Sequence, residues 1–299
     1  MTDATRPNVL DLHPWNQGFT WEGSTPPFRR LTTEQVAQFD RDGFVVVPDV
    51  FGAGEVAGIV AELDRFEAEV ETFLAEQDGQ RFAIAEAGAI TFSTHLVTRS
   101  ARLRAFAAHP FFVDVCADLV GPDVNLYWDQ AVYKKPDKPR RFPWHQDNGY
   151  AYVEPQQYLT CWVALTDATA DNGCPQVARG LHRAGTLAHT YVEPLGWECL
   201  DQPDDVALAE VGAGGVVVFS SLTPHLTGPN LTDEVRKAYI LQYAPVGAAV
   251  LKGDPARPPA TRVTADDRDR QFPVLRRGVP VEPGSPTGPP AGPSPEVGA

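Results

Sequence analysis

The sequence predicts a mainly β protein with flanking helices, an α+β fold built around an antiparallel sandwich or jelly roll. Two observations predict it. Up to about residue 121, apolar residues recur at three- and four-residue spacing, as in amphipathic helices. From about residue 125 the pattern changes to short β-rich runs bounded by Pro, Gly, Asn and Asp, with no long helix between them. Helical crossovers are what a parallel sheet needs, so this order favours antiparallel strands.

The first expected elements are an arm and a capped helix. Residues 1–30 contain Pro, Gly and aromatic residues without periodicity, which predicts an extended arm packed on the body. Thr32 and Gln35 have the spacing of a capping box, so a short helix should begin there and end near Gly43. The run GFVVVPDVF, which follows at once, is an expected strand.

Two further helices are expected before the β-rich part. Apolar residues from Val56 to Leu74 predict one long amphipathic helix over about residues 53–76. A second helical stretch should begin near Pro110, because proline is favoured in a first turn, and end at Gly121.

The β core is expected from about residue 125. It contains the runs VNLYWDQAVYKK, YLTCWVALTDAT, AGGVVVFSS and RKAYILQYAPV. We therefore predict one domain over residues 31–277, with its helices in 31–121. Residues 278–299 are rich in Pro and Gly and poor in large apolar residues, which predicts a disordered tail.

Composition excludes several classes of protein. A net charge of -14 argues against a nucleic-acid partner or an anionic membrane surface, and no apolar run is long enough to span a bilayer. The N-terminus lacks the pattern of a signal peptide, and the four cysteines form no CxxC pair, so we expect a cytoplasmic protein with reduced thiols. Arginine far outnumbers lysine, which suggests a bacterial source. The sequence predicts no oligomeric state.

The run FPWHQDNGY places a histidine and an aspartate two residues apart, at an expected strand end. Residues i and i+2 of a strand point to the same face, so His145 and Asp147 can reach one metal ion. The alternative is a turn that Asp147 caps, with His145 packed on Trp144. The triplet alone does not decide between them.

A second group of residues changes the balance. The run GGVVVFSSLTPHLTGPN predicts a buried strand followed by a turn at His225, and Arg236 opens the next β-rich run. Two imidazoles and one carboxylate on one face are the ligands of non-haem Fe(II) oxygenases, which keep positions open for a 2-oxoacid and O2. The distal carboxylate of that acid needs a fixed cation, and arginine pairs with carboxylates in a bidentate manner. The combination is far more specific than any one part.

On these motifs the chain resembles the phytanoyl-CoA dioxygenase family of Fe(II)/2-oxoglutarate oxygenases, over roughly residues 31–250. The resemblance is carried by LTTEQVAQFDRDGFVVVPDVF, WHQDNGY, VALTDATADNGCPQV, RGLHRAG, and TPHLTGPN through Arg236. It implies a double-stranded β-helix, the cupin-like form of the jelly roll, which agrees with the β-rich runs.

The resemblance also implies roles for individual residues. Fe(II) would be held by the catalytic residues His145, Asp147 and His225, and 2-oxoglutarate would be contacted by Arg236, Thr227, Gln130, Trp162 and His95. The family has a lysine near the position of TFSTHLV, but the first lysine of this chain is Lys134. His95 is the nearest candidate to replace the family lysine.

The expected activity is the hydroxylation of an unactivated C–H bond of a small-molecule substrate, with 2-oxoglutarate and O2 consumed and succinate and CO2 released. In related halogenases a small residue replaces the carboxylate ligand, whereas Asp147 is present here, so we expect hydroxylation. Two alternatives remain: a cupin-like metal enzyme that does not use 2-oxoglutarate, such as an isomerase or hydrolase, and a non-catalytic jelly-roll binding module. Arg236 argues against the first and the complete triad against the second.

Two further groups of residues have alternative interpretations. The aromatic residues Trp128, Trp144, Tyr150 and Tyr152 could line an apolar mouth of the site or belong to the sandwich core. The basic run from Lys134 to Arg141 could guide an anionic substrate or form a solvated loop.

Overall fold

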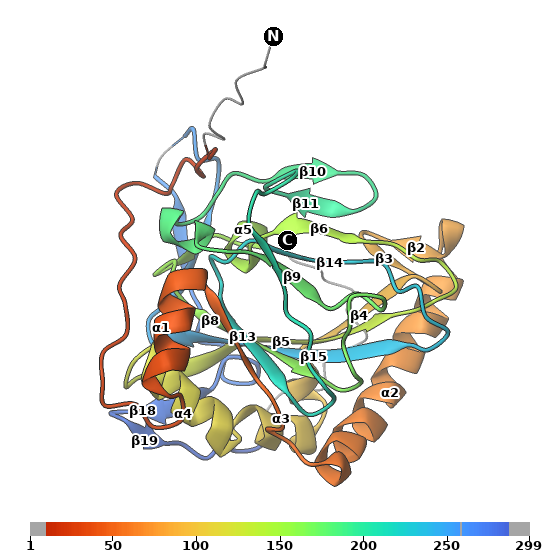
Figure 1. The fold of residues 1–299 in the computed structure, drawn as a ribbon, viewed down its shortest axis with the longest axis horizontal. Coiled ribbons are helices and arrows are strands. Elements are labelled where there is room, and N and C mark those ends of the chain that lie inside the picture. The colour runs from red at the N-terminus through yellow and green to blue at the C-terminus, as the bar shows by residue number, and fades with distance from the viewer. Residues whose placement is uncertain (1–9, 258, 287–299) are drawn as a thin grey trace.

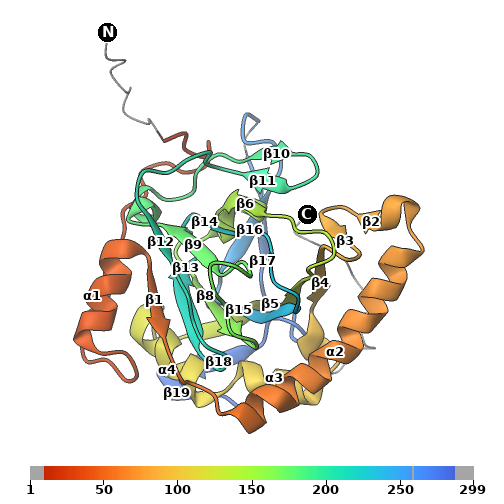
Figure 2. The ribbon, with the colours of Figure 1, turned by 45° about the vertical axis from the view of Figure 1, so that its right-hand side comes forward.

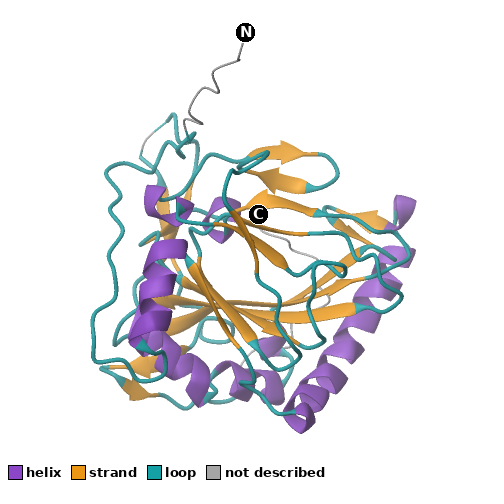
Figure 3. Ribbon diagram, in the orientation of Figure 1, coloured by secondary structure: helices purple, strands orange, loops and turns teal. Residues whose placement is uncertain are grey.

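The computed structural model describes residues 10–257 and 259–286. Two antiparallel sheets face each other, and helices cover the outer face of the larger one (Figures 1 and 3). This is the jelly roll, or double-stranded β-helix, that the sequence predicts. The site described below lies between the two sheets.

The larger sheet has the strand order β1-β13-β8-β15-β5-β4-β3-β2, and β18 with its partner β19 is added beside β5. Its strands are β1 (Phe44–Val47), β2 (Arg81–Phe82), β3 (Ala85–Glu86), β4 (Ile90–Thr94), β5 (Val124–Lys134), β8 (Leu159–Ala164), β13 (Val216–Ser220), β15 (Arg236–Pro245), β18 (Pro273–Arg276) and β19 (Val279–Pro280).

The smaller sheet has the order β12-β9-β14-β6, and two small sheets flank it. Its strands are β6 (Phe142–His145), β9 (Pro175–Ala178), β12 (Val206–Leu208) and β14 (His225–Thr227). The flanking sheets are made of β10 (Thr190–Val192) with β11 (Gly196–Glu198), and of β7 (Val153–Glu154), β16 (Ala249–Lys252) and β17 (Thr261–Thr264).

Four helices gather around the larger sheet (Figure 2): α1 (Thr33–Asp42), α2 (Ala53–Ala75), α3 (Ala101–Ala107) and α4 (Pro110–Leu119). The short helix α5 (Asp147–Tyr150) follows β6 of the smaller sheet, and short 3-10 turns lie at Asp78–Gln80, Leu96–Thr98 and Leu181–Ala184. The capping box is confirmed, because Thr32 accepts from the Gln35 amide while the Gln35 side chain accepts from the Thr32 amide. Within the described ranges, no helix has the length and apolarity that crossing a membrane requires.

Alternation along the central strands separates two cores. In β8, Cys161 and Val163 point to the helical side, where they share a core with α2 and α4. Their neighbours Trp162 and Ala164 point the other way, into the space between the sheets. The same period-two pattern places functional side chains of the larger sheet on its inner face.

The N-terminal half differs from the expected run of helices. Strands β1 to β4 come from it and join the larger sheet, so the β core does not begin at residue 125. The sequence interpretation also missed helix α3, which is only seven residues long and is capped by Ser100. A helix of under two turns shows too few periods to be recognised. The four cysteines are free thiols, as expected.

Both terminal segments lie against the domain where they are described. Leu12 forms a β-bridge with Leu187, and the Asn16 side chain donates to the carbonyls of Ala184 and Thr186, so residues 10–30 form a packed arm. The tail expected from residue 278 begins with a short strand, β19, and the carbonyls of Pro283 and Gly284 accept from Arg104. The segment 278–286 is therefore placed on the body, and the rest of the expected tail lies outside the described residues.

Candidate metal and co-substrate site

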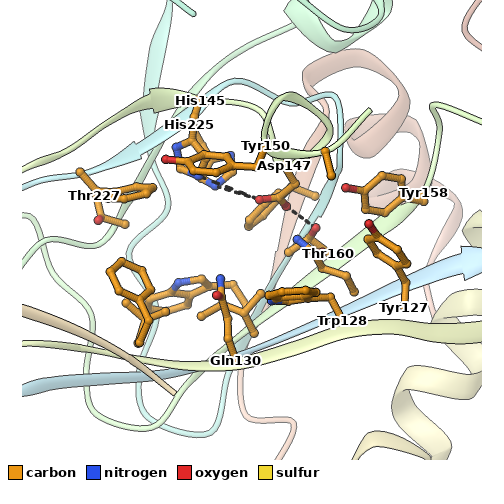
Figure 4. A pocket seen from close by; sticks show the side chains of 18 of the residues that line it. Tyr127, Trp128, Gln130, His145, Asp147, Tyr150, Tyr158, Thr160, His225 and Thr227 are labelled. Atoms are coloured by element: carbon orange, nitrogen blue, oxygen red, sulfur yellow. Dashed lines mark hydrogen bonds and ion pairs between the residues drawn. The ribbon is translucent and has the colours of Figure 1, made fainter. Parts of the chain in front are cut away.

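Two histidines face each other across neighbouring strands of the smaller sheet. His145 ends β6, His225 opens β14, and the two are paired in register with ring centroids 4.2 Å apart. Both side chains are buried and line the same cavity (Figure 4). Antiparallel pairing thus brings together two residues that are far apart in the chain.

Each imidazole is oriented by a backbone carbonyl. The Nδ1 atom of His145 lies 2.9 Å from the Pro143 oxygen, and Nδ1 of His225 lies 3.0 Å from the Thr223 oxygen. A carbonyl only accepts, so it selects the tautomer with the proton on Nδ1 and leaves the Nε2 lone pair facing the cavity. Burial, with the neighbouring His225, lowers the pKa of His145 well below its usual value, which keeps that ring neutral.

Asp147 supplies the third ligand atom. Gln146 is extended, so the carboxylate of Asp147 turns to the same side as His145, as predicted, although Asp147 itself opens the short helix α5. Its Oδ1 atom is 4.0 Å from Nε2 of His145 and 4.0 Å from Nε2 of His225. The three ligand atoms lie within 4.8 Å of one another, a spacing at which one metal ion can bind all of them.

The second oxygen of Asp147 is held by the larger sheet. Thr160 Oγ1, on β8, donates to Oδ2, as the dashed line in Figure 4 shows. Burial raises the pKa of Asp147, and His225, Thr160 and Gln242 counteract that rise. The sequence interpretation missed Thr160, although it precedes Trp162 by two residues on one strand and must share its face.

Arg236 carries a buried positive charge without a partner. Its side chain lines the cavity, is 1% exposed, and none of its three guanidinium nitrogens has a hydrogen-bond partner among the described residues. The guanidinium carbon lies 5.1 Å from the centre of the Trp162 ring. Burial lowers the pKa of Arg236 to about 9, so the side chain remains a cation near neutral pH. A buried cation in this state needs an anion to satisfy it.

The other predicted co-substrate contacts are only partly brought together. Gln130 on β5, Trp162 on β8 and Thr227 on β14 line the same cavity as Arg236. His95 does not: it follows β4, in a left-handed conformation, and packs edge-on against Trp128 at 4.3 Å. Ile90 and Phe92, within β4 itself, line the cavity instead.

The basic run includes a solvated loop, exposed over residues 137–139, but its basic groups are engaged within the chain. Lys134 is 1% exposed, and its Nζ donates to the carbonyls of Arg140, Thr227 and Gly228. It thereby fixes the end of β14 beside Arg236. The other members form ion pairs, with Lys135 bound to Glu67 and Glu71, Lys138 and Arg140 to Glu86, and Arg141 to Glu198. The sequence alone gives no signal that Lys134 is buried.

The four aromatic residues divide between the two interpretations. Trp128 and Tyr150 line the cavity, whereas Trp144 packs in a small core with Ala178 and Leu226. Tyr152 packs against His13 and Trp15 of the arm. The rest of the apolar lining comes from other strands: Ile90, Phe92, Phe142, Trp162, Phe219 and Ile240.

The donor set fits a divalent iron ion with a 2-oxoacid beside it. Two imidazoles and one carboxylate on one side form a facial ligand set with open positions, and the unpartnered guanidinium of Arg236 faces the same cavity. Fold and site together define a non-haem Fe(II)- and 2-oxoglutarate-dependent oxygenase, which also consumes O2.

Comparison with known proteins agrees. A family model described as phytanoyl-CoA dioxygenase (PhyH) matches residues 39–238, and the chain belongs to this family. It is 28% identical over 238 residues to the ectoine dioxygenase of Bordetella bronchiseptica, covering 71% of this chain and 75% of that protein. It is 26% identical over 236 residues to the methylphosphonate hydroxylase of Gimesia maris, covering 75% and 83%.

A solved structure extends the comparison to bound groups. The epimerase SnoN, crystallised with Fe3+, alpha ketoglutarate and nogalamycin RO, superposes with a TM-score of 0.60 at 25% identity, covering 78% of this chain and 95% of that chain. The family resemblance that the sequence motifs indicated is thus confirmed, together with its jelly-roll fold and its cofactors.

Proposed function

We propose that this oxygenase hydroxylates an unactivated C–H bond of a small-molecule substrate and releases succinate and CO2. The observation that carries the proposal is the buried, unpartnered guanidinium of Arg236 in the cavity that also holds the His145, Asp147 and His225 ligand atoms. A cation in that place suits the distal carboxylate of 2-oxoglutarate.

The residues have separable tasks in this proposal. His145, Asp147 and His225 hold the iron, and Arg236 with Thr227 orients the co-substrate from the far end of the cavity. Bound iron and 2-oxoglutarate supply the oxidising chemistry toward O2. Lys134 keeps the Thr227 carbonyl in place, and Thr160 keeps the Asp147 carboxylate turned toward the two imidazoles. The surrounding aromatic side chains exclude water from the reacting C–H bond.

Asp147 is the reason to propose hydroxylation over halogenation. Its carboxylate occupies the third ligand position, so that position is not open to a halide. An intact set of three protein ligands favours the return of oxygen to the substrate carbon. The methylphosphonate hydroxylase of Gimesia maris, a relative of this chain, is named for the same type of reaction.

The two alternative functions lose support. A metal enzyme that does not use 2-oxoglutarate leaves the charge of Arg236 without a partner, which is costly for a buried group. A binding module without catalysis does not need ligand nitrogens and a carboxylate held within bonding reach of one ion.

The test is an anaerobic titration of the protein with Fe(II) and 2-oxoglutarate, followed by succinate assay in air. We expect a weak visible charge-transfer band from the chelated 2-oxoacid, and succinate release after O2 is admitted. Arg236→Gln should weaken 2-oxoglutarate binding about 100-fold or more, because a buried charged contact is lost. Arg257→Gln is the matched control, since Arg257 is exposed and pairs with Asp254.

Two outcomes would contradict the proposal. A protein that binds Fe(II) but shows neither the band nor succinate is not an oxoglutarate oxygenase. A compound that stimulates succinate release without gaining the mass of one oxygen atom would overturn hydroxylation and leave the oxygenase class intact.

A further inference from the structure

The cavity has two chemically different ends. Arg236 and Thr227 lie toward one end, whereas Tyr127, Trp128 and Tyr158 cluster at the other (Figure 4 labels all of these but Arg236). Arg236 and Asp147 are the charged members of the described lining. The aromatic end therefore presents rings, hydroxyl groups and amides to whatever enters it.

A β-bulge builds the aromatic end. Gln242 on β15 pairs with Trp128, and Tyr243 pairs with Leu126, so Tyr127 is an extra residue without a partner on β15. Successive residues of a regular strand point to opposite faces, but a bulge re-aims one of them. Because of it, Tyr127 and Trp128 both line the cavity. Tyr158 meets the Tyr127 ring edge-on at 5.4 Å and closes the group.

Both phenols at this end are neutral. Burial raises the pKa of Tyr127 to about 12 and raises that of Tyr158 well above its usual value. Trp128 is half-buried, and His95 packs against it from behind. The end thus combines a large aromatic surface with a few neutral polar atoms.

The basic side chains around the cavity are already engaged. Lys134 is held by three carbonyls and Arg140 by Glu86. The charge of Arg270 counteracts the rise in the pKa of Tyr127, and Arg270 forms an ion pair with Asp267 at 3.0 Å. Arg236 is the exception, and the proposed function assigns it to the co-substrate. A charged substrate group entering the aromatic end would lose its hydration without gaining an ion-pair partner. For a cation, the attraction of the ring faces, about 0.5–2 kcal/mol, is small beside that cost.

We propose that the Tyr127, Trp128 and Tyr158 end is the substrate subsite and that it receives an uncharged, largely apolar ring. This inference rests on the proposed function, since it assumes that Arg236 is occupied by 2-oxoglutarate. It separates this chain from an enzyme for methylphosphonate, an anion whose only carbon group is a methyl.

The test compares three probes that share one ring and differ in charge. They are 2-naphthalenemethanol, 2-naphthoate and 2-naphthylmethylammonium, each titrated anaerobically into protein loaded with Fe(II) and 2-oxoglutarate. Tryptophan fluorescence gives the Kd, and the visible band reports whether the co-substrate stays bound. We expect the neutral alcohol to bind at least about tenfold more tightly than either charged probe.

A pair of variants locates the binding. Trp128→Leu should weaken the alcohol about tenfold, because it removes the ring but keeps an apolar side chain. Trp128→Arg should reverse the preference in favour of naphthoate. The control is Trp197→Ala, which alters a partly exposed tryptophan on the β10–β11 hairpin, outside the cavity lining.

Each outcome decides the inference. It is overturned if either charged probe binds the wild-type protein as tightly as the alcohol, if the alcohol does not bind, or if Trp128→Leu leaves the alcohol's Kd unchanged. The visible band distinguishes failure of the substrate-class inference from failure of the proposed function. If the band persists while the probe results contradict the inference, only the substrate class is wrong. A missing band would instead refute the use of 2-oxoglutarate.

Discussion

The smaller sheet carries the metal wall of the site and the larger sheet the co-substrate wall. The two walls differ in whether their functional side chains already have hydrogen-bond partners within the chain. On the smaller sheet, His145 and His225 are oriented by the carbonyls of Pro143 and Thr223. On the larger sheet, the guanidinium of Arg236 lies in the cavity with no hydrogen-bond partner in the described part of the chain. The metal wall is therefore pre-organised by the chain, whereas the co-substrate wall is left with a charge that only a ligand can neutralise.

The largest effect is expected from breaking the metal wall. Asp147→Ala removes the carboxylate that lies 4.0 Å from both Nε2 atoms, so Fe(II) affinity and succinate formation should both fall. The loss of Fe(II) affinity should exceed the roughly 10–100-fold typical of losing an outer partner. Anaerobic Fe(II) titration measures it, with Asp254→Ala, at an exposed aspartate, as the control. Unchanged Fe(II) affinity would show that Asp147 is not a ligand.

The co-substrate wall should respond in the opposite sense when stability is measured. Arg236→Met removes an unpartnered buried charge, so the protein without metal and 2-oxoglutarate should gain roughly 1–4 kcal/mol in free energy of unfolding. Urea denaturation of the wild type, Arg236→Met and the exposed-site control Arg257→Met gives the difference. A clear loss of stability in Arg236→Met would mean that the charge is already satisfied within the chain.

A smaller effect is expected where the two walls touch. Thr160→Val keeps the shape of the side chain but removes the hydroxyl that donates to Asp147, so Fe(II) affinity should fall by roughly 10–100-fold while 2-oxoglutarate still binds. Thr72→Val, on the exposed face of α2, is the control. Equal affinities for the Thr160 and Thr72 variants would show that the metal wall needs no help from β8.

The smallest effect, counted per pH unit, is expected on the free energy of unfolding and comes from buried His182. Burial lowers the pKa of His182 to about 4, so this ring is neutral in the folded protein and becomes protonated on unfolding below about pH 6.5. Stability should therefore fall as the pH drops from 6.5 to 4, by up to about 1.4 kcal/mol per pH unit from this residue. His182→Gln should flatten that slope.

His109→Gln is the comparison for this pH effect, because His109 is about one third exposed and lies 3.8 Å from the Glu55 carboxylate. The measurement is the free energy of unfolding at several pH values for the wild type, His182→Gln and His109→Gln. A slope that is unchanged in His182→Gln would assign the acid sensitivity to other groups.

The sequence predicts the metal wall better than the rest of the site. His145 and Asp147 lie two residues apart in a short motif, and His225 follows a recognisable buried strand. Local sequence patterns are therefore enough to predict these three ligands. Helix α2 was likewise expected over 53–76 and is observed over Ala53–Ala75, because its apolar spacing extends over many turns.

The remaining features depend on contacts that no local pattern records. Lys134 stands in a run of basic residues, and only the fold shows that its ammonium group meets three carbonyls. The bulge at Tyr127 depends on the register between β5 and β15, which the sequence of β5 alone does not determine. His95 has a plausible place in the sequence, but its left-handed backbone directs it to Trp128 and away from the cavity.

The pairing of β6 with β14 also affects how the protein is made. A newly synthesised chain that has reached α5 already carries His145 and Asp147, but it lacks His225, Thr223 and the strand that sets their register. A slip of one residue in that pairing would turn His225 away from the cavity. A growing or truncated chain should therefore bind iron poorly. The three ligands come together only when β14 pairs with β6 in the folded domain.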